Sequence, residues 1–418
     1  MIEFDFNFQL ITILLFAAMV VCAIVVFPVY VRRIRRVASY AATHADDCEG
    51  MENAPQPDED GLFTEGFSIV EDEETMKAAA AGPASIVVYA QDQAEALTRL
   101  LPRLLEQRYE PGFEVIVVNE GGSEATSDVV SMLASQHRNL YLTYTPDGAR
   151  SLSRKKLALM LGIKAAQNRV VVHTMATATI TSPLWLASIM RHFSDPSVEV
   201  VLGNAVPAYQ ENGMGSRRRT FDFYASDATW LTAALSGHPY RGTEYNIAYT
   251  RDLFFRNKGF SRSLDKRYGD DDIFVSEIAT AENTVVELCP ESRVEMTAHN
   301  TRQLLKELAM RHEFTGHEVS RSSRRMMATG EWMLWLMILC GIGAAVTALP
   351  NIIPAIAALV VIIAMLWVAS AAWSRTIRAL GGKRLRMSLP WIILMHPFRN
   401  MRLAWRVRRN RSKFYSWG

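Results

Sequence analysis

The chain has 418 residues and a formal net charge of +2. This length accommodates one large domain or two ordinary ones. The small net charge argues against a nucleic-acid-binding protein, which usually carries a strong basic excess. The four cysteines lie far apart, with no CxxC pair and no Cys/His cluster, so the sequence predicts neither a zinc site nor a disulfide framework.

The first predicted element is an uncleaved transmembrane anchor within residues 1–36. Residues 10–31 are almost wholly apolar, which is about the 20 residues that cross a bilayer. A cleaved signal peptide is the alternative, but Glu3 and Asp5 precede the apolar run where a signal peptide would be basic. Positive charge marks the cytoplasmic side of a span, and four arginines follow this one: Arg32, Arg33, Arg35 and Arg36. The sequence therefore places the following domain in the cytoplasm.

Residues 37–84 are predicted to be an acidic flexible linker. Acidic residues crowd between Asp46 and Glu74, and Pro55 and Pro57 lie among them. A segment of this composition cannot bury enough apolar surface to offset the entropy of ordering it.

Strands and helices are predicted to alternate from Ser85 onward. The strand patterns are β-branched and apolar, and cover residues 85–90, 113–120, 139–145 and 169–174. The helical patterns between them cover residues 94–107, 127–135 and 153–166. This alternation predicts a doubly wound α/β sheet that binds ligands at the carboxyl ends of its strands. No G-x-G-x-x-G follows the first strand, so no dinucleotide or other organic cofactor is expected.

Four segments in this region carry a resemblance to a known family. They are SIVVYAQDQAEALTRLLPRLLEQRYEPGFEVIVVNEGGSEAT, SRKKLALMLGIKAAQNRVVVHT, HPYRGTEYNIAYTRDLFF and YGDDDIFVSE, in that order. Together they resemble the motif succession of a membrane-anchored, bacterial-type family 2 glycosyltransferase of GT-A fold. The resemblance extends over residues 85–325 and implies a GT-A glycosyltransferase domain there.

The family resemblance implies an inverting transferase. It would move a sugar from a nucleotide-diphosphate donor to a lipid-linked or glycan acceptor associated with the membrane. Asp271 is expected to be the catalytic base, with Asp270 second and Asp272 in the same triplet, because the register within the triplet is ambiguous. Carboxylates packed this closely raise at least one pKa, which suits a proton acceptor. The alternative is a solvated acidic cluster that caps the next helix.

The resemblance also implies which residues contact the substrates. Gln93 and Glu120 stand where the family has acids at the ends of the first two strands, and either Lys155 or Lys156 approaches the diphosphate. The expected nucleotide-sugar contacts are Ala90, Gln93, Glu120, Lys155, Lys156, Arg311 and His312. The expected acceptor-side residues are Gly242 and Asn246.

A divalent metal, Mg²⁺ or Mn²⁺, is the cofactor that the resemblance implies. However, Met175 and Thr177 occupy the positions of the D-x-D carboxylates, and neither side chain is a useful ligand for a hard cation. Three alternatives are open. The acid triplet and the substrate phosphates hold the metal, cationic residues replace it, or the site has decayed. A decayed site would make the chain an inactive GT-A homologue that serves as a binding or scaffold module in a glycan biosynthesis or export complex.

Two further transmembrane helices are predicted within residues 330–374, followed by a basic amphipathic tail over residues 375–418. The apolar runs are separated by Pro350, Asn351 and Pro354, and basic residues follow the second run. The arginines and aromatic residues of the tail are typical of a segment on an anionic membrane surface, with membrane lipids rather than nucleic acid as partners. The sequence thus predicts an integral protein of the inner (plasma) membrane. Three spans are fewer than a processive polymer synthase would need.

Overall fold

The computed structural model describes residues 6–44, 80–145, 152–208, 213–319, 321–349, 351–383, 385 and 388–415. The chain forms two compact units. The helical unit comprises Met1–Tyr40, Gly213–Thr232 and Arg321–Trp405, and the sheet unit comprises Ala41–Asn212, Ala233–Ser320 and Arg406–Gly418. Most of the predicted acidic linker lies outside the described residues.

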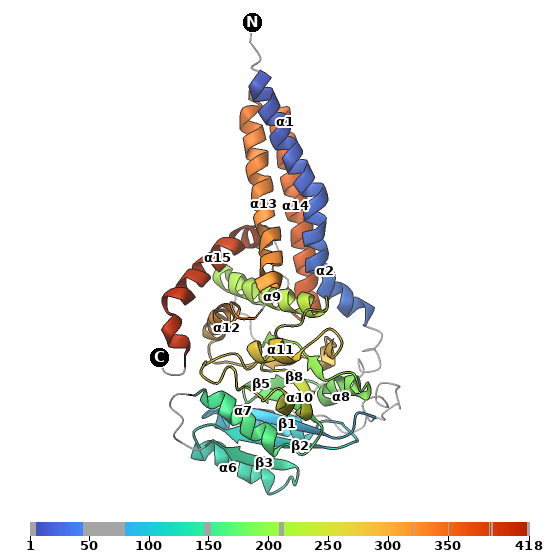
Figure 1. Ribbon diagram of the computed structural model, residues 1–418, viewed down its shortest axis with the longest axis vertical. Helices are drawn as coiled ribbons and strands as arrows, with labels where there is room; N and C mark the ends of the chain where they lie inside the picture. The colour runs from blue at the N-terminus through green and yellow to red at the C-terminus, as the bar shows by residue number, and fades with distance from the viewer. Residues whose placement is uncertain are drawn as a thin grey trace. The chain divides into compact units, whose positions relative to one another are not determined.

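Three helices of the helical unit are long and apolar enough to cross a membrane. The first is continuous from α1 (Phe6–Val21) through a π-helical stretch (Cys22–Val26) into α2 (Phe27–Thr43). The other two lie in α13 (Arg321–Thr347) and α14 (Ile353–Ala379). Figure 1 shows α1, α13 and α14 side by side. The prediction of one N-terminal and two C-terminal candidate spans is confirmed.

Close backbone approach and polar contacts hold these three helices together. A Cβ atom on Gly330 would lie 2.1 Å from the ring of Tyr30, so only glycine lets α13 pack this tightly against α2. The indole nitrogen of Trp373 donates to the Tyr30 hydroxyl at 3.3 Å, and the Thr376 hydroxyl donates to the Ile34 carbonyl at 2.6 Å. These contacts satisfy polar groups that the apolar surroundings would otherwise leave unpaired.

Two further helices complete the helical unit: most of α9 (Met214–Ala234) and most of α15 (Leu389–Arg409). An ion pair joins these two helices. The guanidinium of Arg399 on α15 binds the carboxylate of Asp222 on α9, with its closest contact at 2.5 Å. His396, one turn earlier on α15, lies 2.7 Å from the carboxylate of Glu331 on α13. α15 is thus tied to both α9 and α13.

The sheet unit is built on a seven-stranded sheet with strand order β3-β2-β1-β4-β8-β6-β9. The four predicted strands form its parallel half: β1 (Ala84–Ala90), β2 (Phe113–Asn119), β3 (Leu140–Tyr144) and β4 (Val170–Met175). The sequence did not indicate the strands of the other half, which are β6 (Val200–Leu202), β8 (Ile247–Thr250) and β9 (Thr284–Val286). β8 is antiparallel to β4 and to β6, and β9 is parallel to β6. A second sheet has the order β5-β10-β7, formed by Ala178–Ile180, Val294–Met296 and Ala205–Pro207.

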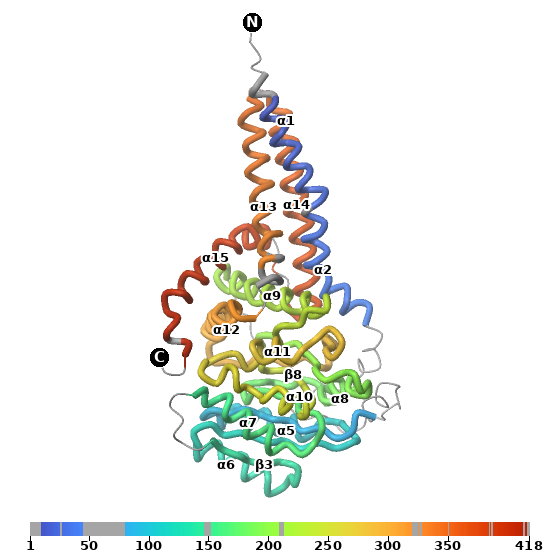
Figure 2. Tube along the Cα trace, in the orientation of Figure 1, coloured from blue at the N-terminus to red at the C-terminus, as the bar shows by residue number. Residues whose placement is uncertain are grey.

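The helices of the sheet unit alternate with its first strands, as predicted. They are α5 (Ala94–Leu105), α6 (Glu124–Ala134) and α7 (Arg154–Ala165), followed by α8 (Trp185–Met190), α10 (Arg251–Arg256), α11 (Ile273–Ile278) and α12 (Thr301–Thr315). Figure 2 traces this alternation along the chain. A Cβ atom on Gly162 of α7 would lie 2.7 Å from both Val87 and Val118, so this glycine sets α7 directly against β1 and β2. α7 therefore begins close to the carboxyl ends of these strands.

One cysteine departs from the sequence-based expectation. Cys289 is disulfide-bonded, although the wide spacing of the cysteines predicted no disulfide framework. Cys22 and Cys340 are free thiols.

Candidate functional site

The expected nucleotide end of the site lies at the carboxyl ends of β1 and β2. Ala90 is the last residue of β1, and Glu120 directly follows β2. Glu120 is buried, and it accepts hydrogen bonds from the Tyr89 hydroxyl and from the amide nitrogen of Gln91, at 3.2 Å in the second case. Arg154, at the start of α7, lies 3.6 Å from the same carboxylate. Glu120 is therefore oriented by three neighbours at this edge of the sheet.

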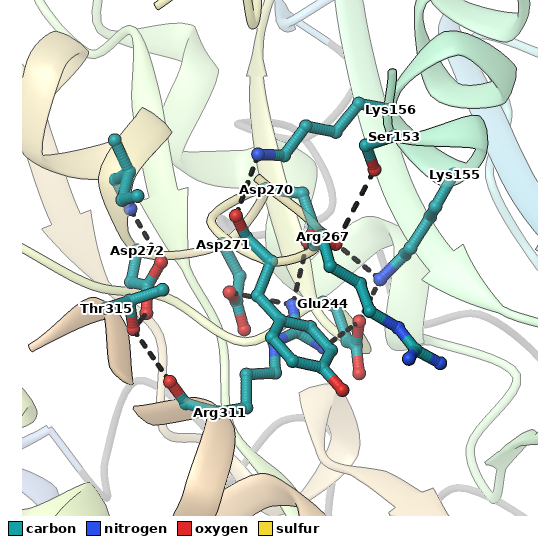
Figure 3. A network of polar contacts seen from close by, with 12 residues as sticks. Ser153, Lys155, Lys156, Glu244, Arg267, Asp270, Asp271, Asp272, Arg311 and Thr315 are labelled. Atoms are coloured by element: carbon teal, nitrogen blue, oxygen red, sulfur yellow. Dashed lines mark hydrogen bonds and ion pairs between the residues drawn. The ribbon is translucent and has the colours of Figure 1, made fainter. Parts of the chain in front are cut away.

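A cluster of buried ion pairs lies beside this edge (Figure 3). We call it the ion-pair cluster, and its members are Lys155, Glu244, Asp270, Asp271 and Arg311. The ammonium group of Lys155 binds Glu244 and lies 2.6 Å from Asp270. The guanidinium of Arg311 lies 2.5 Å from Glu244, 2.9 Å from Asp270 and 2.8 Å from Asp271. Three carboxylates thus share two cations, which leaves one negative charge when all five groups are ionised.

Four separate segments of the chain deliver these side chains. Lys155 comes from the first turn of α7, and Glu244 from the loop before β8. Asp270 and Asp271 precede α11, and Arg311 lies on α12. The ring of Tyr89 lies 5.5 Å below the Lys155 ammonium, which links the cluster to the residue that orients Glu120.

Asp270 and Asp271, which both contact Arg311, have opposite pKa shifts. The pKa of Asp271 is raised to about 7, mainly by burial and also by the charges of Asp272, Asp270 and Glu244, against the opposing effect of Arg311. Burial also acts to raise the pKa of Asp270, but Arg311 and Lys155 outweigh it and hold that pKa well below its usual range. At neutral pH, Asp270 is therefore a fixed anion, whereas Asp271 can take up or release a proton.

Asp272 has a different environment from the rest of the triplet. Its Oδ1 accepts a hydrogen bond from the backbone nitrogen of Ile273 at 2.7 Å, at the start of α11. Its Oδ2 accepts from the Thr315 hydroxyl, and the side chain is fully buried. The contacts of Asp272 are therefore those of a residue that caps a helix, which is the alternative interpretation of the triplet.

The two adjacent lysines of α7 point to different partners. Lys155 enters the ion-pair cluster, whereas the ammonium group of Lys156 donates to the backbone carbonyls of Ser263, Lys266 and Tyr268, at 2.5, 3.3 and 2.8 Å. Lys156 is fully buried, and burial lowers its pKa to about 8. Lys156 thus lies under the loop that leads to the acid triplet, and only Lys155 is among the carboxylates.

Three other residues that were expected to contact the substrates, Gln93, Gly242 and His312, have different surroundings. Gln93 precedes α5, with its side-chain oxygen 3.5 Å from the backbone nitrogen of Gln91. The backbone nitrogen of Gly242 donates to the carbonyl of Asp271 at 2.7 Å, which anchors the loop that carries Glu244. His312 is half-buried next to Arg311, and its carbonyl accepts from Arg241 at 3.3 Å.

Asn246 is held by three protein partners. Its amide nitrogen donates to the carbonyls of Asn204 and Ser292, at 2.9 and 2.6 Å. Its oxygen accepts from the indole nitrogen of Trp185 at 3.2 Å, and the side chain is fully buried. These contacts bind the start of β8 to α8 and to the segments that precede β7 and β10. A role for Asn246 toward an acceptor stays a prediction.

Sequence reasoning missed one residue of the site. Glu244 was not singled out, although it lies between the expected residues Gly242 and Asn246 and pairs with both cations of the cluster. Near the cluster, His173 is buried in β4, and burial together with the nearby Lys155 lowers its pKa to about 4. An acidic residue within a glycine-containing family motif was the available signal for Glu244.

The residues at the D-x-D positions do not fit a divalent metal. Met175 ends β4, and the Thr177 hydroxyl is hydrogen-bonded to the hydroxyl of Tyr245 at 3.1 Å. The nearby carboxylates are paired with Lys155 and Arg311. Within the described part of the chain, no three His, Cys, Asp or Glu side chains are grouped so that they could hold an ion.

Comparisons with known proteins point to one family. The model of the family described as glycosyl transferase family 2 matches residues 85–269. A mannosyltransferase from Pyrobaculum calidifontis, solved in complex with GDP-Man and Mn²⁺, is 18% identical in sequence, with a TM-score of 0.46; the match covers 94% of this chain and 99% of that one. TarS 1–349 from S. aureus, solved in complex with UDP-GlcNAc, is 13% identical with a TM-score of 0.39, covering 78% of this chain and 92% of that one. No curated protein matches the sequence.

Proposed function

We propose, from the match of residues 85–269 to the glycosyl transferase family 2 model, that the chain is an inverting, hexosyltransferase-type enzyme. It moves a sugar from a nucleotide-diphosphate donor to a lipid-linked or glycan acceptor at the membrane. The observation that carries the proposal is the pair Asp270 and Asp271, which share one guanidinium but have opposite pKa shifts. Perturbed carboxylates of this kind are typical of acid–base sites.

The proposed reaction is a single displacement. The acceptor hydroxyl oxygen attacks the anomeric carbon of the donor sugar, and the bond from that carbon to the diphosphate oxygen breaks. The hydroxyl proton passes to a carboxylate of the enzyme, and the bonding electron pair leaves with the nucleoside diphosphate. Attack opposite to the leaving group inverts the configuration of the anomeric carbon.

Asp271 is the proposed base. A carboxylate whose pKa is about 7 is a stronger base than an ordinary one, yet half of it is ionised at neutral pH. Asp270 stays ionised, and its ion pair with Arg311 holds that guanidinium in place. The cluster carries one excess negative charge when all five groups are ionised. When Asp271 accepts a proton, the cluster becomes neutral.

Lys155 is the proposed contact of the leaving diphosphate. The resemblance implies a metal in this role, but the residues at the D-x-D positions do not fit one, and no step is assigned to it. The Lys155 side chain is 16% exposed, compared with 5% for Arg311, so Lys155 is the cation of the cluster that an incoming ligand meets first. An ammonium group acts there as a point charge on the phosphate oxygens.

The proposed setting is the cytoplasmic face of the inner membrane. Three candidate spans belong to the helical unit, and arginines follow the apolar core of the first. Anchoring a transferase to the membrane raises the local concentration of a membrane-bound acceptor. The alternative, an inactive scaffold, is favoured by a single observation: Met175 and Thr177 in place of the D-x-D carboxylates.

The decisive experiment is a binding titration, because it needs no acceptor. Full-length protein in detergent is titrated with UDP, GDP and their sugar conjugates, with Mn²⁺ or with EDTA. Saturable binding of one nucleotide-sugar, followed by its consumption when membrane glycolipids are added, supports the transferase. We expect Asp271→Asn to bind the same donor but to turn it over about 10²–10⁴-fold more slowly. Lack of binding to every nucleotide by folded protein would leave the scaffold function.

A further inference from the structure

The loop over residues 263–268 leads directly into the acid triplet, and the start of α7 holds one side of it. The carbonyl of Leu264 accepts from the backbone nitrogen of Ser153 at 2.8 Å. The buried ammonium group of Lys156 binds three carbonyls of the same loop. A charged donor shared by three backbone acceptors fixes the course of the loop on this side.

The C-terminal end of the chain holds the other side. A 3₁₀ turn over Arg411–Phe414 follows α15 within the sheet unit. The backbone nitrogen of Arg267 donates to the Phe414 carbonyl at 3.1 Å, and Lys266 pairs with Tyr415 in an antiparallel bridge. The loop before the acid triplet thus forms backbone contacts with a segment at the far end of the sequence.

Aromatic contacts continue from this segment to the ion-pair cluster. The ring of Phe414 stacks on Phe314 of α12, with centroids 4.9 Å apart and planes 19° apart. The ring of Phe414 also lies 6.0 Å from that of Tyr268, and the Arg311 guanidinium lies 5.4 Å from the centroid of Tyr268. Arg311 in turn donates to Asp270 and Asp271. Phe414 is 8% exposed, so this contact is well shielded from solvent.

We propose that the C-terminal segment 411–415 positions the catalytic carboxylates through Phe414, Tyr268 and Arg311. Phe414 supports the Tyr268 ring, and that ring fixes the plane of the Arg311 guanidinium. The orientation of the guanidinium sets the direction of both carboxylates, which a base needs in order to reach an acceptor hydroxyl. Phe414 is thus a positioning residue rather than a catalytic one. This inference rests on the proposed transferase function.

The sequence pattern of the tail favoured a different location for this aromatic residue. Phe414 and its arginine neighbours were expected to lie on a membrane surface. Instead, the ring of Phe414 packs against α12 and the loop before the acid triplet, so protein and not lipid covers it. Its burial next to Tyr268 is what ties the segment to the site.

The test compares Phe414→Ala with the conservative Phe414→Tyr in full-length protein. The matched control is Tyr144→Ala, because Tyr144 is an aromatic residue of the sheet unit that is 68% exposed and outside these contacts. Hydrogen–deuterium exchange reports on residues 263–272, and steady-state turnover of the donor gives kcat and KM. In Phe414→Ala we expect faster exchange in this loop, a roughly tenfold lower kcat and a KM for the donor within about twofold. Phe414→Tyr should restore both readouts, and Tyr144→Ala should change neither.

The possible results separate this inference from the proposed function. If the wild type turns over a donor and Phe414→Ala has the wild-type kcat, the positioning role is wrong. It is also wrong if exchange in residues 263–272 is unchanged, whether or not turnover is measurable. A wild type that binds no nucleotide-sugar would contradict the transferase function, while the exchange comparison would still decide whether the segment orders the loop.

Discussion

Arg311 donates from a single guanidinium nitrogen to Asp270 at 2.9 Å and to Asp271 at 2.8 Å. The two acids are adjacent in sequence, buried and bound to the same cation, yet only Asp270 is also paired with Lys155. Arg311 and Lys155 together lower the pKa of Asp270, whereas burial and the neighbouring carboxylates raise the pKa of Asp271. The neighbouring carboxylates can therefore have different roles, one as a permanent anion and the other as a proton acceptor.

We predict that the rate of sugar transfer rises with pH through about 7. Asp271 accepts a proton only when it is ionised, and its raised pKa means that acidification below about 7 removes the ionised form. The rate should fall about tenfold for each pH unit below that value. A pH–rate profile of wild type beside Asp271→Asn checks this. A profile that is flat from about pH 5 to pH 9 would assign the base to another group.

Substitution of the two adjacent lysines should have different effects. Lys155→Met removes the less buried cation of the cluster, so we expect nucleoside diphosphate to bind about 10- to 100-fold more weakly. Lys156→Met leaves three buried carbonyls without their donor, so we expect a loss of about 2–3 kcal/mol in the free energy of unfolding. Calorimetric titration and thermal unfolding of both variants form the comparison. The reverse assignment of effects would mean that Lys156 contacts the ligand.

The third acid of the triplet should behave as a helix cap. Asp272→Ala removes the acceptor for the Ile273 nitrogen and for the Thr315 hydroxyl, and should destabilise the protein by about 1–2 kcal/mol. Asp272→Asn keeps an acceptor oxygen and should recover most of that stability. Denaturation curves measure the effect, and turnover by Asp272→Asn should stay far above that by Asp271→Asn. Equal loss of turnover in the two asparagine variants would contradict this division.

The helical unit should become less stable as the pH rises. Burial acts to lower the pKa of His396, but Glu331 and Asp222 outweigh both burial and the repulsion from Arg399, and the pKa is raised. A raised histidine pKa gives stability that is fully present below the unfolded value of about 6.5 and is lost as the pH passes through the folded value. Thermal unfolding in detergent should therefore show wild type and His396→Gln converging at high pH. A constant difference between them across the range would show that charge on His396 is unimportant.

Much of the fold could be predicted from the sequence, for a local reason. The strands β1, β2 and β4 contain runs of Val and Ile that are buried on both faces, and such runs are visible without knowledge of their partners. The strands β6, β8 and β9 are short, and β8 pairs antiparallel to its neighbours. Three- and four-residue strands have too little periodicity to be recognised alone.

The candidate site was only partly predictable because its contacts are tertiary. The acid triplet and a lysine at the start of a helix were apparent from the motifs. Which of Lys155 and Lys156 faces the acids depends on one residue of helical rotation, about 100°, which helix boundaries from sequence do not resolve. The pairing of Glu244 with Arg311 joins segments far apart in sequence, and no local pattern encodes it.

The division of the chain between the two units limits how the protein can be dissected. The sheet unit is interrupted by Gly213–Thr232, which belongs to the helical unit. The strands that end at Ala90 and Asn119 precede this interruption, whereas Glu244, the acid triplet and Arg311 follow it. No uninterrupted gene fragment therefore encodes the whole site without part of the helical unit. Deletion of the apolar helices alone would leave a stretch of α9 without its partners. Evolutionary exchange of the sheet unit would have to carry α9 with it.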